Sequence, residues 1–159
     1  MKKIVSLILI LVLSLSMGAV YAAPDTVSPE DLGTTNNLIS VLTPENLKDS
    51  TADETYIVSG MGVTGAVLTF YKYDEVNKVY TKIFVPVSYV DQFGTSVVKY
   101  NEATITVGET GRFINTVSLV NGKNNILIRA EHNGFYQIVK LDLTKNSAFI
   151  EAIKNLLSI

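Results

Sequence analysis

The sequence predicts an all-β fold, and the stretch from Gly108 to Ala130 carries most of that prediction. It contains two runs of alternating apolar residues, separated by Asn121-Gly122, a dipeptide typical of tight turns. Because successive side chains of a strand point to opposite faces, each run can place one face on a core. The expected core residues are Phe113, Val117 and Leu119 in the first run and Ile126, Ile128 and Ala130 in the second. Two such runs, separated by a turn and each with one face on a core, predict an antiparallel β-sandwich.

The first 22 residues have the composition of a secretory signal peptide. Lys2 and Lys3 precede an apolar run from Ile4 to Leu15, and Val20 and Ala22 supply the small residues that a signal peptidase reads. The apolar run is short for a bilayer span of about 20 residues. We therefore expect cleavage after Ala22, a mature chain that is secreted or associated with the cell envelope, and no membrane insertion after cleavage.

Charge and cysteine content restrict the partners of the mature chain. Without Lys2 and Lys3, eleven basic residues stand against fifteen acidic ones, a net charge of −4. The basic residues are scattered singly, whereas binding to nucleic acid requires a basic cluster. There is no cysteine, so the fold has no disulfides and must depend on its hydrophobic core. A chain of 137 residues is long enough for one such domain.

The first half of the mature chain predicts an arm followed by three strands. Residues 23–37, rich in Pro, Thr, Ser and Asn, read as a flexible N-terminal arm. Strands are expected at 38–44, at 55–60 and, most clearly, at 66–73. The third strand alternates, which places one set of residues inward and the other outward. The inward set is Ala66, Leu68 and Phe70, and the outward set is Val67, Thr69, Tyr71 and Tyr73.

The second half predicts a less regular region before the two clear strands. Residues 74–78 form a turn, and residues 79–90 form one strand whose Pro86 places its middle at an edge or a bulge. Residues 91–102 read as an extra hairpin or a long loop. Asn133-Gly134 is a second tight turn, after which Val139, Leu141 and Leu143 share a buried face. The sandwich thus covers 38–145, and Ser147 can cap a short C-terminal helix within 146–159.

The order of these elements resembles the bacterial immunoglobulin-like domains of secreted and surface proteins. The resemblance spans about Leu38 to Leu143. Its motifs are Tyr56-Ile-Val-Ser-Gly60, Gly65-Ala66-Val-Leu68-Thr-Phe70, Gly111-Arg-Phe113, Val117-Ser-Leu119, Gly122-Lys-Asn124 and Ile126-Leu-Ile128-Arg-Ala130. It implies an immunoglobulin-like sandwich used as a spacer, an adhesion module or an accessory to a surface enzyme, with no catalytic residues to transfer. The segment 79–102 and the terminal helix depart from the family pattern.

The residues that could support catalysis are few and separated. His132 is the only histidine and stands beside a turn, whereas a catalytic triad or a zinc site needs more than one such group. The adjacent acids Asp53-Glu54 and Asp74-Glu75 fall at strand ends, where solvated turn residues are expected. We therefore predict a non-enzyme, with no catalytic, cofactor-binding or metal-binding residues.

Three tyrosines supply the predicted contact surface. Tyr71 and Tyr73 point away from the expected core, and Tyr80 lies across the turn from them. Tyrosines anchor protein contacts and stack on sugars, although cross-strand pairs covering a sheet would show the same pattern. The leading hypothesis is an exported module that binds an envelope protein or glycan, or has a structural role there. The alternatives are a carbohydrate-contacting accessory module using these tyrosines, and a small secreted hydrolase or enzyme inhibitor using residues 91–102. The inhibitor version predicts a protruding, rigid loop there.

Overall fold

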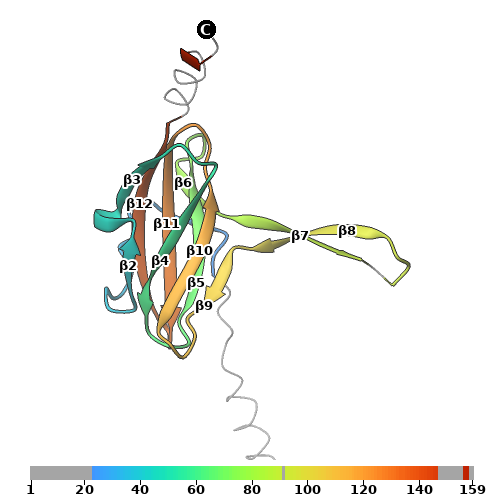
Figure 1. Ribbon diagram of the computed structural model, residues 1–159. Helices are drawn as coiled ribbons and strands as arrows, with labels where there is room; N and C mark the ends of the chain where they lie inside the picture. Colours follow the sequence, from blue (N-terminus) through green and yellow to red (C-terminus); the bar gives the residue numbers. More distant parts are fainter. Residues whose placement is uncertain (1–22, 91, 147–155, 158–159) are drawn as a thin grey trace, which may run out of the picture.

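The protein is described by a computed structural model that covers residues 23–90, 92–146 and 156–157. These residues form two β-sheets that share one core, and a two-stranded hairpin that projects from them, to the right in Figure 1. The predicted all-β class is confirmed. The strands are β1 (Thr26–Val27), β2 (Ile39–Thr43), β3 (Lys48–Thr51), β4 (Thr55–Gly62), β5 (Val67–Asp74), β6 (Val79–Lys82), β7 (Phe84–Val90), β8 (Ser96–Glu102), β9 (Thr104–Thr106), β10 (Arg112–Ser118), β11 (Gly122–His132) and β12 (Phe135–Lys145), with a short 3₁₀ turn at Glu45–Leu47.

The larger sheet has the strand order β1-β6-β5-β11-β12-β3, and β9 also pairs with β5. The small sheet has the order β10-β4-β2. All pairings are antiparallel except that of β12 with β3. The turn between β11 and β12 is the predicted one, with φ of 49° at Asn133 and 81° at Gly134. Positive φ at both central residues suits the right-handed twist of paired strands, which explains the Asn-Gly dipeptide.

The main core lies between the two sheets and contains the residues that alternation predicted. The small sheet contributes Phe113 and Val117, and Leu119 follows directly after β10. The larger sheet contributes side chains from its three central strands: Leu68, Phe70, Ile126, Ile128, Ala130, Leu141 and Leu143. Ala66, just before β5, is also buried there. Val139 is half-buried against the same cluster. Period-two alternation therefore identified the inner faces correctly on β5, β10 and β11.

Residues 23–37, called the N-terminal strap below, lie across the outer face of the larger sheet. Val27 packs with Tyr71, Tyr80 and Leu127 in a second buried cluster. Further along, Lys140 Nζ donates to the Pro29 carbonyl at 2.6 Å, and Gly33 forms a bridge with Gln137. The expectation of an arm without structure is wrong, because short pairings and side-chain hydrogen bonds attach this polar segment to the sheet.

The hairpin interrupts the strand that pairs with β5 on the side away from β11. β6 pairs with Tyr71–Asp74 and β9 with Val67–Thr69, both along the same edge of β5. Between them the Ile83 N–H donates to the Phe70 carbonyl at 2.9 Å, and the Phe70 N–H donates to the Ala103 carbonyl at 3.1 Å. The Ala103 N–H closes the gap by donating to the Ile83 carbonyl at 2.8 Å. The chain thus leaves the sheet at Ile83, returns at Ala103 and resumes the same strand position.

This insertion changes two sequence expectations. The single strand predicted over residues 79–90 is wrong, because β6 belongs to the larger sheet and β7 to the hairpin. Of the two options for residues 91–102, an extra hairpin is the one found, since β8 pairs with β7 along its whole length. The polar strand β3 lies between the strands expected at 38–44 and 55–60, and the sequence analysis did not predict it.

Two expectations concern residues beyond those described. The leader, residues 1–22, lies outside them, and so do residues 147–155 and 158–159 of the expected C-terminal helix. Within the described ranges no helix combines the length and apolar character needed to cross a membrane.

Candidate binding surface

The three predicted contact tyrosines lie together, but the strap covers them. Tyr71 is fully buried and its hydroxyl donates to the Pro24 carbonyl at 2.8 Å, while Tyr80 is also buried. Tyr73 is half-buried, with its ring centroid 5.2 Å from that of Tyr80 at a tilt of 59°. Their outward parity was correct and the exposure inferred from it was wrong for Tyr71 and Tyr80. Partner contact through these rings stays a prediction. Of the three tyrosines, only Tyr73 keeps part of the exposure that such contact needs.

Lys82 ties the strap to the root of the hairpin. Its Nζ donates to the Ala23 carbonyl at 2.8 Å, to Asp25 Oδ1 at 3.2 Å and to Glu102 Oε1 at 3.0 Å, and its side chain is 2% exposed. Burial by itself lowers the pKa of Lys82, yet the hydrogen bonds and charges of Glu102 and Asp25 outweigh it, so the pKa is raised. The ammonium is thus held charged where β6 ends, and it fixes both the strap and the first pair of the hairpin.

Strong alkali is expected to destabilise the fold through the covered tyrosines. Burial raises the pKa of Tyr71 and Tyr80, and burial together with the hydrogen bond to Asp49 raises that of Tyr56 to about 12. Groups whose pKa is higher in the folded than in the unfolded chain stabilise fully below about pH 10 and lose that contribution as pH rises towards the folded value. Urea midpoints should therefore fall steeply above about pH 10.

The Tyr71→Phe variant separates this cause from general alkaline effects. Its midpoint should fall less steeply with pH above about 10, because one raised phenol is gone. Tyr89→Phe, on the exposed hairpin, should keep the wild-type pH dependence. If the urea midpoint fell equally steeply with pH in the wild type and in Tyr71→Phe, the buried Tyr71 phenol would not be a cause of the alkaline destabilisation.

The β7–β8 hairpin carries a concentration of exposed apolar side chains: Phe84, Val85, Val87, Tyr89, Val90, Val98 and Tyr100. Every residue of its two strands is exposed except the half-buried Val97. Paired residues point to the same side, so the register Phe84↔Glu102 to Val90↔Ser96 sorts the side chains into two faces. One face carries Phe84, Pro86, Val90, Val98 and Tyr100, and the other carries Val85, Val87, Tyr89 and Val97. An antiparallel sheet normally has one polar face towards solvent. In this hairpin both faces carry apolar side chains.

The edges of the hairpin are open as well. Among the described residues β7 and β8 pair only with each other, so each presents a row of backbone groups on its outer side. Such edges are sites for pairing with another chain unless they are blocked. Pro86 partly blocks the β7 edge because it has no N–H, whereas β8 contains no proline. Sequence reasoning had placed residues 91–102 as anomalous but missed the apolar faces, which the run Phe84-Val-Pro-Val-Ser-Tyr-Val90 could have indicated.

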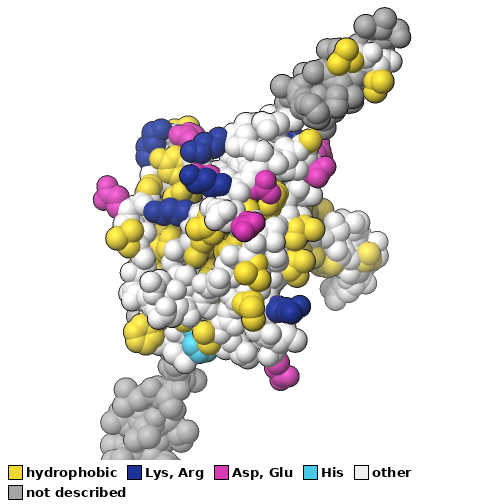
Figure 2. Space-filling view, turned by 60° about the vertical axis from the view of Figure 1, so that its left-hand side comes forward, with side chains coloured by type: hydrophobic (Ala, Val, Ile, Leu, Met, Phe, Trp, Pro, Cys, Tyr) yellow, Lys and Arg dark blue, Asp and Glu magenta, His cyan; other side chains and the backbone are white. Residues whose placement is uncertain are grey.

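A second exposed apolar surface lies on the outer side of the small sheet. This surface consists of Leu42, Ile57, Met61 and Ile114, all of which are at least half exposed. It is called the small-sheet face below. A hollow of about 620 Å³ lies on it, lined by residues of all three strands that include Leu42, Met61 and Ile114. In Figure 2, hydrophobic side chains lie among uncharged atoms over much of the described surface, and most of the visible Lys and Arg gather in its upper part.

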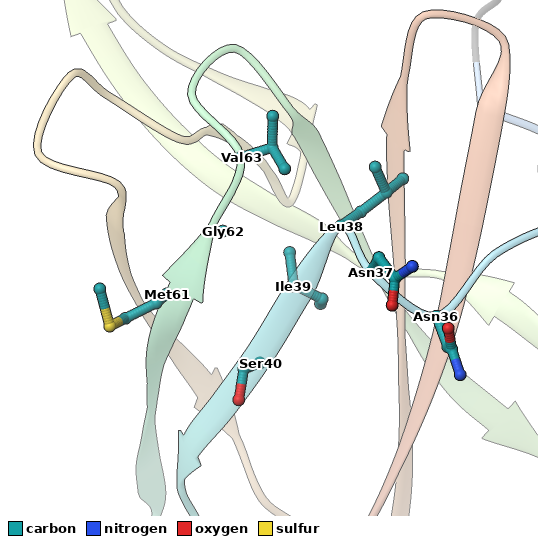
Figure 3. A pocket seen from close by; sticks show the side chains of 8 residues that line it. All are labelled: Asn36, Asn37, Leu38, Ile39, Ser40, Met61, Gly62 and Val63. Carbon is teal, nitrogen blue, oxygen red and sulfur yellow. The ribbon is translucent and has the colours of Figure 1, made fainter.

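An adjoining hollow of about 390 Å³ lies where β2 begins and β4 ends, and shares Met61 with the first. Figure 3 shows its wall: Ser40 and Met61 stand on neighbouring strands, Val63 lies past Gly62, and Asn36 and Asn37 come from the end of the strap. No charged residue lines it. Neither hollow is lined by a carboxylate or a histidine, and the first has one charged residue, Arg112. Both hollows therefore suit contact with apolar side chains better than acid–base chemistry.

Of the residues weighed for catalysis, His132 and Asp74 line neither of these hollows, whereas Asp53 and Glu54 line a third one of about 530 Å³ together with Ile57 of the small-sheet face. His132 is half-buried at the β11–β12 turn, with Nε2 3.0 Å from Asn133 Nδ2. Asp74 Oδ1 accepts hydrogen bonds from the N–H groups of Val76 and Asn77, at 2.8 and 3.1 Å, within the predicted turn. Asp53 and Glu54 are exposed. The described residues hold no group of three or more His, Cys, Asp or Glu placed to bind a metal ion.

Comparison of the chain with family models, with curated proteins and with solved structures gave no match. The resemblance to bacterial immunoglobulin-like domains therefore depends on the sequence motifs named above and stays a prediction.

Proposed function

We propose that this chain is an exported, non-catalytic immunoglobulin-like module that binds a protein partner at the cell envelope through its β7–β8 hairpin. The signal-like leader supports export, and the motifs from Tyr56 to Ala130 support the family of the sandwich. The projecting hairpin, apolar on both faces, is the observation that carries the binding function.

The position of the hairpin between β6 and β9 supports a role for it other than stabilising the sandwich. β6 and β9 already complete the edge of β5, and the main core contains no residue of β7 or β8. Recognition elements are commonly grafted onto a rigid scaffold in this manner. The core of the sandwich therefore gains no packing from the two hairpin strands, so their apolar composition must have another cause.

The energetics of an isolated hairpin support a partner. Two strands without a third are marginally stable in water, and exposed contiguous apolar surface marks interaction sites. Val90 is 68% exposed and Tyr100 is 66% exposed, so both side chains would gain from burial. Removing apolar area from water contributes about 25 cal/mol per Å², and a few buried aromatic or apolar residues often carry most of the binding energy of a complex.

A capture experiment with a hairpin-deleted protein tests the proposal. In the variant, residues 86–100 are replaced by Asn-Gly, which can close a two-residue turn between the remaining strand stubs. The sandwich should stay folded, and capture of partners from envelope extract by the immobilised protein should be lost. The matched control is Tyr73→Phe, which keeps the hairpin intact. Capture that survives the deletion at wild-type level would refute the hairpin as the binding element.

Enzyme inhibition is the second candidate, favoured by the protrusion of the hairpin that includes residues 91–102. An inhibitor of this kind would present the turn between β7 and β8 to an active site. Titration of extracellular hydrolases with the wild type and with the hairpin-deleted variant distinguishes it, since inhibition should disappear with the hairpin.

A further inference from the structure

We propose that the partner of the hairpin is a second copy of this chain, whose small-sheet face receives it. This inference rests on the proposed function, because it names the occupant of the same hairpin. It would make the protein a self-assembling module.

Within residues 23–90, 92–146 and 156–157, two apolar surfaces have no partner. One is the hairpin, and the other is the small-sheet face, where Ile114 is 66% exposed beside the hollow of about 620 Å³. The hairpin projects away from its own sandwich (Figure 1), so it reaches such a face only on another molecule. A surface and its complement on one chain are the requirement for self-association.

The two surfaces match in length. β7 and β8 each have seven residues, and the small sheet offers β10 with seven and β4 with eight. At roughly 3.3 Å per residue, both surfaces extend about 23 Å. The hairpin can therefore lie on the small sheet along its whole length, as one sheet packs on another.

The charges also permit this contact. The charged residues of β7 and β8 are Lys99 and Glu102, and Glu102 is already bonded to Lys82 at the root. Among the outward residues of β2, β4 and β10 the charged one is Arg112. Lys99 lies on the face of the hairpin opposite to Tyr100, and Arg112 is the first residue of β10. A contact made through the Tyr100 face therefore places neither positive charge at its centre. The contact is then mainly hydrophobic, so it should persist at high salt.

A lipid surface fits the hairpin less well than a second copy. Strands of seven residues fall short of the 9–11 that a membrane-crossing strand needs, by about two residues or more. A single lysine also provides little attraction to anionic headgroups.

Disulfide trapping tests the contact directly, because the chain has no cysteine. Tyr100→Cys on the hairpin is mixed with Ile114→Cys on the small-sheet face under mild oxidation. A disulfide between the two variants is expected at least about tenfold faster than in a control mixture of Tyr100→Cys with Val76→Cys, an exposed position in the β5–β6 turn. Equal rates would overturn the proposal.

Sedimentation of the mature chain provides the second measurement. The wild type should associate with rising concentration, and Tyr100→Ser and Ile114→Ser should each weaken association by about tenfold, equivalent to about 1.4 kcal/mol. Mixing the two variants should recover part of it, because one intact contact can form between them. A wild type that stays monomeric, or an association that ignores Ile114→Ser, would refute the small-sheet face as the occupied surface.

Two further outcomes separate this inference from the proposed function. A monomeric wild type that still captures another envelope protein through its hairpin would overturn self-association and leave the proposed function standing. Hairpin-dependent co-flotation with vesicles of phosphatidylcholine and phosphatidylglycerol, without self-association, would overturn both in favour of a lipid surface.

Discussion

Phe113→Ala is expected to lower the free energy of unfolding by about 3–5 kcal/mol, the range for removing a buried aromatic ring. Phe113 is 5% exposed and belongs to the core between the two sheets. Its loss would leave a cavity that neighbouring strands, held by their ladders, cannot fill. Because a domain's whole stability is about 5–15 kcal/mol, the effect should be plain in urea or thermal denaturation.

Val67→Ala serves as the matched control for this substitution. Val67 is half-buried on the opposite parity of β5 and is not part of the main core. Its truncation should cost much less than that of Phe113. A denaturation experiment that ranked the two in the opposite order would show that the core faces are assigned wrongly.

Gly60→Ala is expected to destabilise by about 1–3 kcal/mol or more, as overpacking of a tight interior does. A Cβ at Gly60 would lie 2.6 Å from Phe113 Cζ and 2.3 Å from the Ser40 carbonyl oxygen. The ring could shift slightly, but the oxygen belongs to the backbone of β2, which pairs with β4. The added methyl would therefore force two strands of the small sheet apart.

Gly108→Ala is the control, since a Cβ at Gly108 meets no atom within 4 Å. It should be neutral or stabilise slightly, by reducing the freedom of the unfolded chain. Adding Phe113→Ala to Gly60→Ala should cost less than the sum of the two, because removing the ring relieves part of the clash. A Gly60→Ala protein as stable as Gly108→Ala would contradict the close packing of β2, β4 and Phe113.

Sequence alternation predicted strand faces well where both sides of the chain had distinct environments. On β10 Phe113 shares its parity with Val117, and on β11 Ile128 shares its parity with Ile126. Phe113 and Ile128 could therefore be placed inward correctly. Asn133-Gly134 likewise identified its turn, because few residues adopt the positive φ that the turn requires. These features depend on interactions within a few residues of the chain.

The exposure of the tyrosines could not be predicted in the same way. Parity places Tyr71 and Tyr80 on the outer side of the larger sheet, but it does not show what lies beyond that side. Their cover comes from Val27 and Pro24, about 45 residues or more away along the chain, in a segment whose polar composition suggested disorder. The strap is held by single hydrogen bonds and a two-residue strand, which leave no periodic signal.

The exposed apolar faces of the hairpin were not predicted, because apolar residues in a strand normally indicate a core. Residues 79–90 contain no glycine, asparagine or aspartate, so no turn residue marks Ile83 as the point where the chain leaves the sheet. β3 was missed for the opposite reason, since Lys48–Thr51 has no apolar residue and gains its place only by pairing with β12.

The closed root of the hairpin also bears on how this chain folds. Joining β6 to β9 along β5 requires the ends of a 19-residue excursion, residues 84–102, to meet at Ile83 and Ala103. A flexible loop of that length would cost roughly 2–3 kcal/mol in closure entropy. β7 and β8 can zip together locally within microseconds, which brings the two halves of the interrupted strand into register before the larger sheet is complete. The hairpin, which lies outside the core, would then form early in folding and align β6 with β9 along β5.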